Sequence, residues 1–305
     1  MRHLRLLAAW LSILSSLAPP ASAWNATGHR LIAAIAYDRL TPQARARVDA
    51  LIRRHPDYEK IFLLDAPADP AARARAAFIA AAVWPDQIKG DPRFYDEARP
   101  DALPTPLLPG FPDMGRHTTW HYYDTPYTPD GAEAKEQAPP HALSELNRII
   151  PIIGKEHDAV YLLPWLEHIT GDVHQPLHCV TRYLKSQPQG DAGGNFVYIG
   201  TRNLHSVWDG AAGQDLSDAY AAKYIAEATA THPAPSRLEK KPEEWIEEGY
   251  KLAISDVYTF GLETGTRDHP IPMPPGYEAH AAQVAEQRIA IAGYRLAAVL
   301  NEKLK

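Results

Sequence analysis

Residues 168–178, which read His-Ile-Thr-Gly-Asp-Val-His-Gln-Pro-Leu-His, constrain this chain more than any other stretch. They hold three histidines and an aspartate at the end of an apolar run that is typical of a buried helix. His168 and Asp172 are four residues apart, so a helix would place both side chains on one face. Pro176 cannot continue a helix, so the chain must bend before His178. Imidazole and carboxylate groups together suit zinc, and we therefore expect a metal site here rather than a helix with internally paired polar groups.

Residues 1–23 have the three parts of a secretory signal peptide. Arg2 and Arg5 precede an apolar run, and a small-residue cleavage site, Ala-Ser-Ala, follows it. The run is too short for a spanning helix with these flanks, which favours a cleaved signal over a membrane anchor. We therefore expect a periplasmic or secreted protein whose mature domain spans 24–305 and begins at Trp24.

The composition of the chain is that of a globular protein, with enough residues for one large core or two small ones. It has 305 residues, of which 45% are hydrophobic and 22% charged. Its single cysteine, Cys179, excludes an intramolecular disulfide, so stability after export must come from the core, from metals or from both. The formal charge of −6 becomes −8 without the two arginines of the signal peptide. Such a chain lacks the broad basic surface of most nucleic-acid binders, so a polyanionic substrate would have to meet positive charge from metals.

Apolar periodicity and capping residues predict an all-α fold, a mainly helical single domain with long loops and one short β-hairpin. Thr27, Thr41 and Asp69 stand where an N-cap is needed, and proline follows the last two at the first helical position. The run 118–124 is rich in β-branched and aromatic residues and predicts a strand, while 193–200 predicts the hairpin. The helices are expected at about 28–40, 42–54, 70–84, 141–154, 158–174, 215–230, 242–256 and 277–303.

Further residues elsewhere in the chain repeat the same ligand chemistry. Asp86 follows a Trp-Pro pair at the end of a predicted helix, and His121 lies in a Trp-His-Tyr-Tyr-Asp run. His205 and Asp209 are four residues apart and form a second pair on one helix face. His29 lies five residues after the predicted mature start. Any one of these residues could be a surface or capping residue, but their recurrence favours a metal centre assembled from distant parts of the chain.

These motifs resemble the family of zinc-dependent single-strand nucleases, which is related to bacterial zinc phospholipase C. The resemblance runs from Trp24 nearly to the C-terminus, and its most specific part is the 168–178 stretch. It implies the helical fold of that family. The other matching motifs are Trp24-x-x-x-Gly28-His29, Trp84-x-Asp86, His121-Tyr122-Tyr123-Asp124, Gly193-Gly194-Asn195, Asn203-Leu204-His205-Ser206-x-Trp208-Asp209 and Gly293-Tyr294-Arg295-Leu296-Ala297.

By that resemblance, three zinc ions share one cleft. The third ion would take the α-amino nitrogen and carbonyl oxygen of Trp24 together with His29, and Asp172 would bridge it to the first ion. An α-amine exists at Trp24 only after cleavage of the signal peptide, and its reference pKa of about 8 lets zinc displace the proton. Asp86 and Asp172 are expected to carry the most weight in catalysis. The first ion would be bound by Asp86, His121, His168 and Asp172, and the second by His178, His205 and Asp209.

The resemblance also implies an activity. Three zinc ions and three ligand aspartates would leave the cleft with a charge of about +3, which suits a phosphodiester. The expected reaction is metal-assisted hydrolysis of single-stranded DNA and RNA to 5′-phosphorylated products, with 3′-nucleotidase activity. Unpaired bases would stack on an aromatic wall, for which Phe94, Tyr95 and Phe111 are candidates. Asn195 is a candidate for phosphate or base contact, although a role in the turn is an equal alternative. We expect a monomer with no membrane or protein partner.

Two other functions stay open at this point. A zinc phospholipase C would keep the metals, but Asp209 stands where the phospholipases that we compare have glutamate, and this favours a nuclease. A non-catalytic exported zinc-binding protein is the second alternative, although a site with open positions for water argues against it because structural zinc sites are closed. His117, four residues before His121, is an alternative ligand, and His174 is expected beside the ligands or at the surface.

Overall fold

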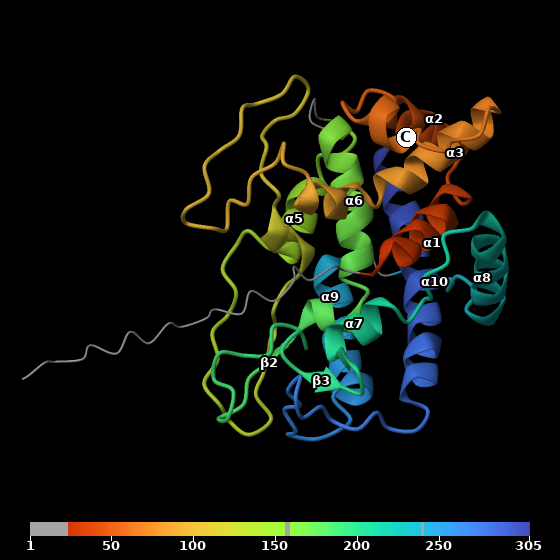
Figure 1. The fold of residues 1–305 in the computed structure, drawn as a ribbon. Coiled ribbons are helices and arrows are strands. Elements are labelled where there is room, and N and C mark those ends of the chain that lie inside the picture. Colours follow the sequence, from red (N-terminus) through yellow and green to blue (C-terminus); the bar gives the residue numbers. More distant parts are fainter. Residues whose placement is uncertain (1–23, 156–158, 239–240) are drawn as a thin grey trace, which may run out of the picture.

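The computed structural model describes residues 24–155, 159–238 and 241–305, so the predicted signal peptide lies outside the described residues. Helices dominate the fold, which confirms the predicted class (Figure 1). Shorter turns of 3₁₀ or π helix occur at Tyr58–Phe62, Ile88–Gly90, Thr118–His121, Pro176–Cys179 and Ala253–Val257. The α-helices are α1 (Ala26–Tyr37), α2 (Pro42–Ile52), α3 (Pro70–Ala81), α4 (Trp84–Gln87), α5 (Ala142–Ile149), α6 (Ala159–Asp172), α7 (Leu204–Asp209), α8 (Asp218–Thr231), α9 (Pro242–Leu252) and α10 (Tyr277–Lys303).

The helix α6 forms the centre of the fold. Every residue of α6 is buried, as its apolar sequence predicts, and it packs against both α1 and α10 (Figure 1). The helices α1 and α10 also approach each other closely. Glycine at position 293 allows this approach, because a Cβ there would lie 2.5 Å from Ile35 Cγ2. As a result, the last turn of α6 carries His168 and Asp172 into the protein interior.

The capping residues explain where the first helices begin. Thr41 accepts a hydrogen bond from the Ala44 amide, and Asp69 caps α3 in the same way, so both predictions are confirmed. The prediction for Thr27 is wrong, because Asn25 caps α1 through a 3.1 Å bond from the Gly28 amide and the helix begins earlier.

The strands are short and differ from the predicted ones. The pair β1 (Pro126–Tyr127) and β2 (Thr181–Arg182) is parallel, and β3 (Tyr198–Ile199) with β4 (Arg202–Asn203) is antiparallel. The hairpin predicted at 193–200 is displaced and spans 198–203 instead. Gly193 and Gly194 form a turn before it, with positive φ angles of 59° and 80°.

The strand predicted at 118–124 is wrong. Thr118–His121 forms a 3₁₀ helix instead. His117 starts it with φ 48°, and the His117 ring stacks on Trp120 at 3.8 Å between centroids. Tertiary packing therefore overrides the β-propensity of this run. In the part of the chain that the structure describes, no helix is both long and apolar enough to cross a membrane.

Candidate metal centre

Three groups of potential ligand atoms lie in the interior, and the 168–178 stretch contributes to each of them. Within each group the ligand atoms lie within 4.8 Å of one another. Together they contain all eight side chains that the sequence predicted as ligands. The groups are His29, His168 and Asp172; Asp86, His121 and His168; and His178, His205 and Asp209.

The ninth predicted ligand, Trp24, lies beside these groups. Its side chain is fully buried, and the amide of the next residue, Asn25, donates a 3.2 Å hydrogen bond to the carbonyl of Asp209. A Cβ at Gly28 would lie 2.7 Å from Trp24 Cβ, so glycine is needed for this approach. The predicted mature start is therefore held next to Asp209, a member of one of the ligand groups.

Asp172 joins two of the groups. Its Oδ1 lies 3.3 Å from His29 Nε2, whereas its Oδ2 lies 3.1 Å from His121 Nδ1 and 3.2 Å from His168 Nε2. The two oxygens of one carboxylate thus face different ligand groups. A Cβ at Gly171 would lie 2.8 Å from His29 Nδ1, so the glycine before Asp172 makes room for His29.

Backbone carbonyls fix which ring nitrogen carries the proton in His178 and in His205. His178 Nδ1 donates to the His121 carbonyl and His205 Nδ1 to the Gly193 carbonyl, each at 2.7 Å. Each neutral ring therefore presents the lone pair of its Nε2, and these two atoms lie only 3.1 Å apart. Two lone pairs at that distance repel each other unless a cation lies between them. Hydrogen bonds of this kind are typical of histidines that bind metal.

Asp209 completes this group. Its Oδ2 lies 3.4 Å from His205 Nε2, and its Oδ1 accepts a 2.8 Å hydrogen bond from Gln175 Nε2. Burial raises the pKa of Asp209 well above its usual value, which a neighbouring cation would offset. Gln175 also accepts from the Leu177 amide and so fixes the turn before His178.

The residues around Asp86 and Asp172 differ electrostatically from the group of His178, His205 and Asp209. Burial opposes ionisation of Asp86 and Asp172, but nearby positive charge outweighs it and holds both pKa values below the usual range. For Asp86 the largest such contribution is from Lys89 and for Asp172 from His168. Burial lowers the pKa of His121 to about 3. Burial alone would also lower the pKa of His168, but the two carboxylates raise it, so an ion bound there would have to displace its proton.

The donor set fits zinc. Among the described residues, both ring nitrogens of His29 and Nε2 of His121 are buried without a hydrogen-bond partner. Neutral imidazoles and carboxylates converge at the ligand groups, and three imidazoles are held by carbonyls, His168 Nδ1 by that of Ala82 at 2.8 Å.

Lys89 is a site residue that the sequence analysis missed. Its Nζ lies 2.7 Å from Asp86 Oδ1, and its side chain is only 8% exposed. It stands three residues after Asp86 on a helical turn, and this spacing is the sequence pattern that could have identified it. Lys89 therefore places a positive charge beside Asp86, a member of one of the ligand groups.

Several other predicted residues lie outside the ligand groups. His117 is paired with Glu97 at 3.1 Å and with Asp113 at 2.9 Å, so it is not part of any group that the described residues form. The two phenylalanines suggested for base stacking, Phe94 and Phe111, are 1% and 6% exposed and pack around Trp84, so their assignment to a stacking wall is wrong.

Asn195 occupies the turn before β3. Its side-chain amide donates a 2.8 Å hydrogen bond to the Ala192 carbonyl, which supports the turn role that the sequence left open. The next residue, Phe196, is 43% exposed. The His205 amide contacts the Gly194 carbonyl at 3.4 Å, so this turn borders the second metal group.

Comparison with known proteins agrees with the motifs. A family model described as S1/P1 Nuclease matches residues 24–305. Nuclease S1 of Aspergillus oryzae (strain ATCC 42149 / RIB 40) is 29% identical over 164 residues, which cover 47% of this chain and 54% of that protein. The chain therefore spans about half the length of the curated relative that it matches. Because the family model matches from Trp24 to the last residue, the chain belongs to the S1/P1 nuclease family.

Proposed function

We propose that this protein is a zinc-dependent nuclease that hydrolyses phosphodiester bonds of single-stranded DNA and RNA to 5′-phosphorylated products, and that it also acts as a 3′-nucleotidase. The observation that carries the proposal is the Asp172 carboxylate, whose two oxygens face different ligand groups inside the protein. A carboxylate so placed can bridge two ions, as phosphodiester hydrolysis at paired metals requires. Membership of the S1/P1 nuclease family supports the same reaction.

The ligands that we propose follow the three groups. Trp24, through its α-amine and carbonyl oxygen, would join His29 and Asp172 at the third ion after the signal peptide is cut. Zinc bound in this way would lower the pKa of a water molecule and stabilise negative charge on the phosphate. The first ion would be held by Asp86, His121, His168 and Asp172, and the second by His178, His205 and Asp209.

The chain's own residues would orient the substrate. The Lys89 ammonium beside Asp86 would bind a phosphate oxygen and keep that carboxylate ionised. The exposed Phe196 ring, on the turn beside the group of His178, His205 and Asp209, would stack on an unpaired base, and Asn195 would hold that turn through its bond to the Ala192 carbonyl. A duplex hides its bases from such a ring, which would explain a preference for single strands.

The stacking role of Phe196 has a direct test. Replacing Phe196 with alanine should raise KM for single-stranded DNA about tenfold, because one base–aromatic stack is removed. Leu262, another exposed apolar side chain at 53%, gives the matched alanine control. Equal KM values for the two variants would remove Phe196 from the binding surface.

Export forms part of the proposal. The α-amine ligand requires cleavage before Trp24, so we propose a periplasmic or secreted enzyme that works as a monomer. Purified protein with its N-terminus confirmed as Trp24 should be loaded with zinc and assayed on single-stranded DNA, RNA, a 3′-mononucleotide and phosphatidylcholine. Cleavage of the nucleic acids supports the proposal. Hydrolysis of lipid alone would identify a phospholipase instead, and no hydrolysis by a fully metallated sample would indicate a non-catalytic zinc protein.

A further inference from the structure

His174 lies between the two ends of the ligand-bearing stretch, yet it faces away from the metal groups. It is fully buried. Its Nδ1 donates a 2.7 Å hydrogen bond to the Thr170 carbonyl, and its Nε2 lies 2.9 Å from Arg295 Nη1. A guanidinium can only donate, so Nε2 is the acceptor and the ring is neutral with its proton on Nδ1. The tautomer and orientation of this imidazole are therefore fixed.

Two arginines of α10 hold His174 from one side. Arg295 bonds the ring, and Arg288 Nε donates a 3.1 Å hydrogen bond to the His174 backbone carbonyl. Both arginines are nearly fully buried, at 3% and 4% exposure. The ring and the main chain of a single residue are thus tied to the same helix.

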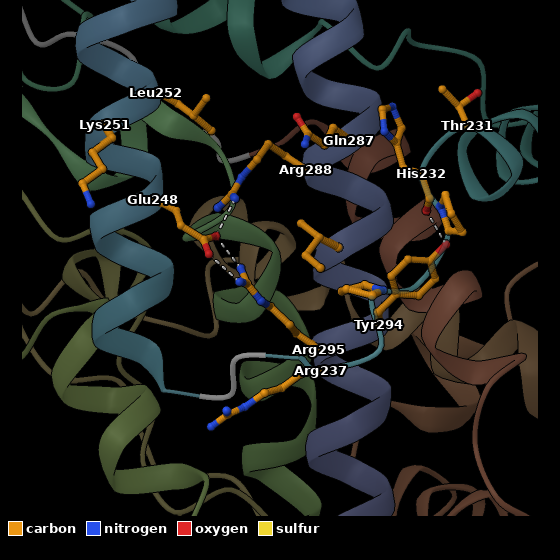
Figure 2. Close-up of a pocket in the computed structure, with 13 residues that line it drawn as sticks. Thr231, His232, Arg237, Glu248, Lys251, Leu252, Gln287, Arg288, Tyr294 and Arg295 are labelled. Carbon is orange, nitrogen blue, oxygen red and sulfur yellow. Dashed lines mark hydrogen bonds and ion pairs between the residues drawn. The ribbon is translucent and has the colours of Figure 1, made fainter.

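Glu248 on α9 holds the two arginines in turn. Its carboxylate accepts bonds of 2.7 and 2.6 Å from Arg295 and one of 2.8 Å from Arg288. Figure 2 shows the carboxylate facing both guanidinium groups across the gap between the two helices. Two buried like charges need such a counter-charge, because an unpaired buried ion is strongly destabilising.

A cavity of about 740 Å³ opens onto Glu248, Arg288 and Arg295. The Glu248 side chain is 40% exposed, so this residue can be changed without opening the core. Lys251 also lines the cavity, but Figure 2 shows it pointing away from the gap that Glu248 and the arginines fill.

We propose that Glu248, Arg288 and Arg295 are positioning residues that act through His174 on the metal centre. His174 stands two residues after Asp172 and four before His178, in the turn that separates two ligand groups. Gln175 already ties this turn to Asp209, and the contacts from α9 and α10 tie its other side. Together, the contacts of Gln175 and of His174 would set the distance between the ligand group that contains Asp172 and the one that contains His178. The inference rests on the proposed function, because this distance matters to catalysis only if metals are bound.

The test compares two neighbouring glutamates on α9. Glu248→Gln weakens the grip on both arginines, whereas Glu247→Gln makes the same charge change at a 55% exposed side chain that pairs with Lys251 at 2.6 Å. Zinc affinity is measured by titration with a chelator, and kcat and KM on single-stranded DNA. In Glu248→Gln the most weakly held zinc should bind about tenfold less tightly, as for other residues that orient metal ligands. kcat should fall while KM stays unchanged, and Glu247→Gln should match the wild type.

Arg295 provides the second variant. Arg295→Lys keeps the charge but loses the planar fork that bonds both His174 and Glu248, so its zinc affinity should fall between those of the wild type and Arg295→Gln. The melting temperature of the zinc-free proteins reports purely structural damage. Equal zinc affinity and kcat in the two glutamate variants would overturn the inference, even if Glu248→Gln melts lower. A wild-type protein that binds zinc but cuts no nucleic acid would overturn the proposed function alone, and one that binds no zinc would overturn both.

Discussion

Two histidine–carboxylate clusters lie at opposite ends of one short 3₁₀ helix, and they solve the same electrostatic problem differently. His117, just before it, has a carboxylate on each ring nitrogen, and although burial opposes charging, Asp113 and Glu97 raise its pKa to about 9. At the other end, His121 Nδ1 lies 2.9 Å from His168 Nε2, and burial lowers the pKa of His121 to about 3. The first cluster is completed by a proton. In the second, carboxylates favour a proton on His168, and a bound metal would have to displace it.

The comparison shows what distinguishes a structural ion cluster from a metal site. Around His117 there are two carboxylates for one imidazole, so a proton balances the charge. In the metal centre, carbonyls accept from the Nδ1 atoms of His168, His178 and His205, so each of these rings, when neutral, presents the lone pair of its Nε2 to the interior. The hydrogen bonds made by the outer nitrogen, rather than the presence of histidine and aspartate alone, decide between proton and metal.

Among the tests of this difference between the two clusters, removal of metal should have the largest effect on activity and stability. Chelation should abolish nuclease activity and lower the melting temperature by about 10 °C or more, because metal-binding free energy is part of the folding free energy in a chain without a disulfide. Calorimetry with and without chelator measures the shift. An unchanged melting temperature would contradict the three-metal centre.

Asp172 should be the most sensitive single residue. Asp172→Asn should lower kcat by about a thousandfold or more, since the bridging carboxylate serves two ions and several kcal/mol of transition-state stabilisation depend on them. Asp86→Asn removes a ligand from one group only and should cost less. Steady-state kinetics of zinc-saturated variants decide, and a larger loss in Asp86→Asn would refute the bridge.

Lys89 should have an intermediate effect. Lys89→Gln should lower kcat/KM by about tenfold to a hundredfold, because a charge-assisted contact to phosphate is lost. Lys223→Gln, at a lysine that is 73% exposed on α8, is the control with the same charge change. Identical kinetics for both variants would place Lys89 outside the substrate path.

His117 should give the smallest effect, and one that is independent of metal. Its folded pKa of about 9 lies above the ordinary 6.5, so the ion pairs stabilise fully below pH 6.5, and this contribution is lost as the pH rises through 9. His117→Gln should therefore destabilise most just below pH 6.5, by about 1–3 kcal/mol, and least above pH 9. Denaturant unfolding in chelator measures the difference, with exposed His269→Gln as control. A gap that widens with pH would contradict the assignment.

Much of the fold could be predicted because its determinants are local. The helix predicted at 277–303 has the observed limits, and Thr41 and Asp69 cap their helices as expected. The strand predicted at 118–124 failed because stacking of His117 on Trp120 involves packing that propensity does not register. The Thr27 cap failed because Asn25 was the better acceptor two residues earlier.

The side chains of the three candidate ligand groups could be found from the sequence because metal chemistry restricts residue type and spacing. Residues that support the ligands carry no such restriction. The spacing of Lys89 from Asp86 indicates an ion pair, but only the packed structure places that pair beside the ligand groups. The contact of Glu248 with Arg295 joins residues 47 apart, and that of Arg295 with His174 joins residues 121 apart. Such long-range partners become visible only when the helices are packed.

The most direct test of the account is the zinc content of two proteins that differ only at the N-terminus. One begins at Trp24, and the other carries additional residues before it, so that its Trp24 nitrogen is a peptide amide. We expect three zinc ions per chain in the first protein and two in the second, measured by elemental analysis after removal of loosely bound metal. One ion or none in the first protein, or equal contents in both, would contradict a centre completed by the mature N-terminus.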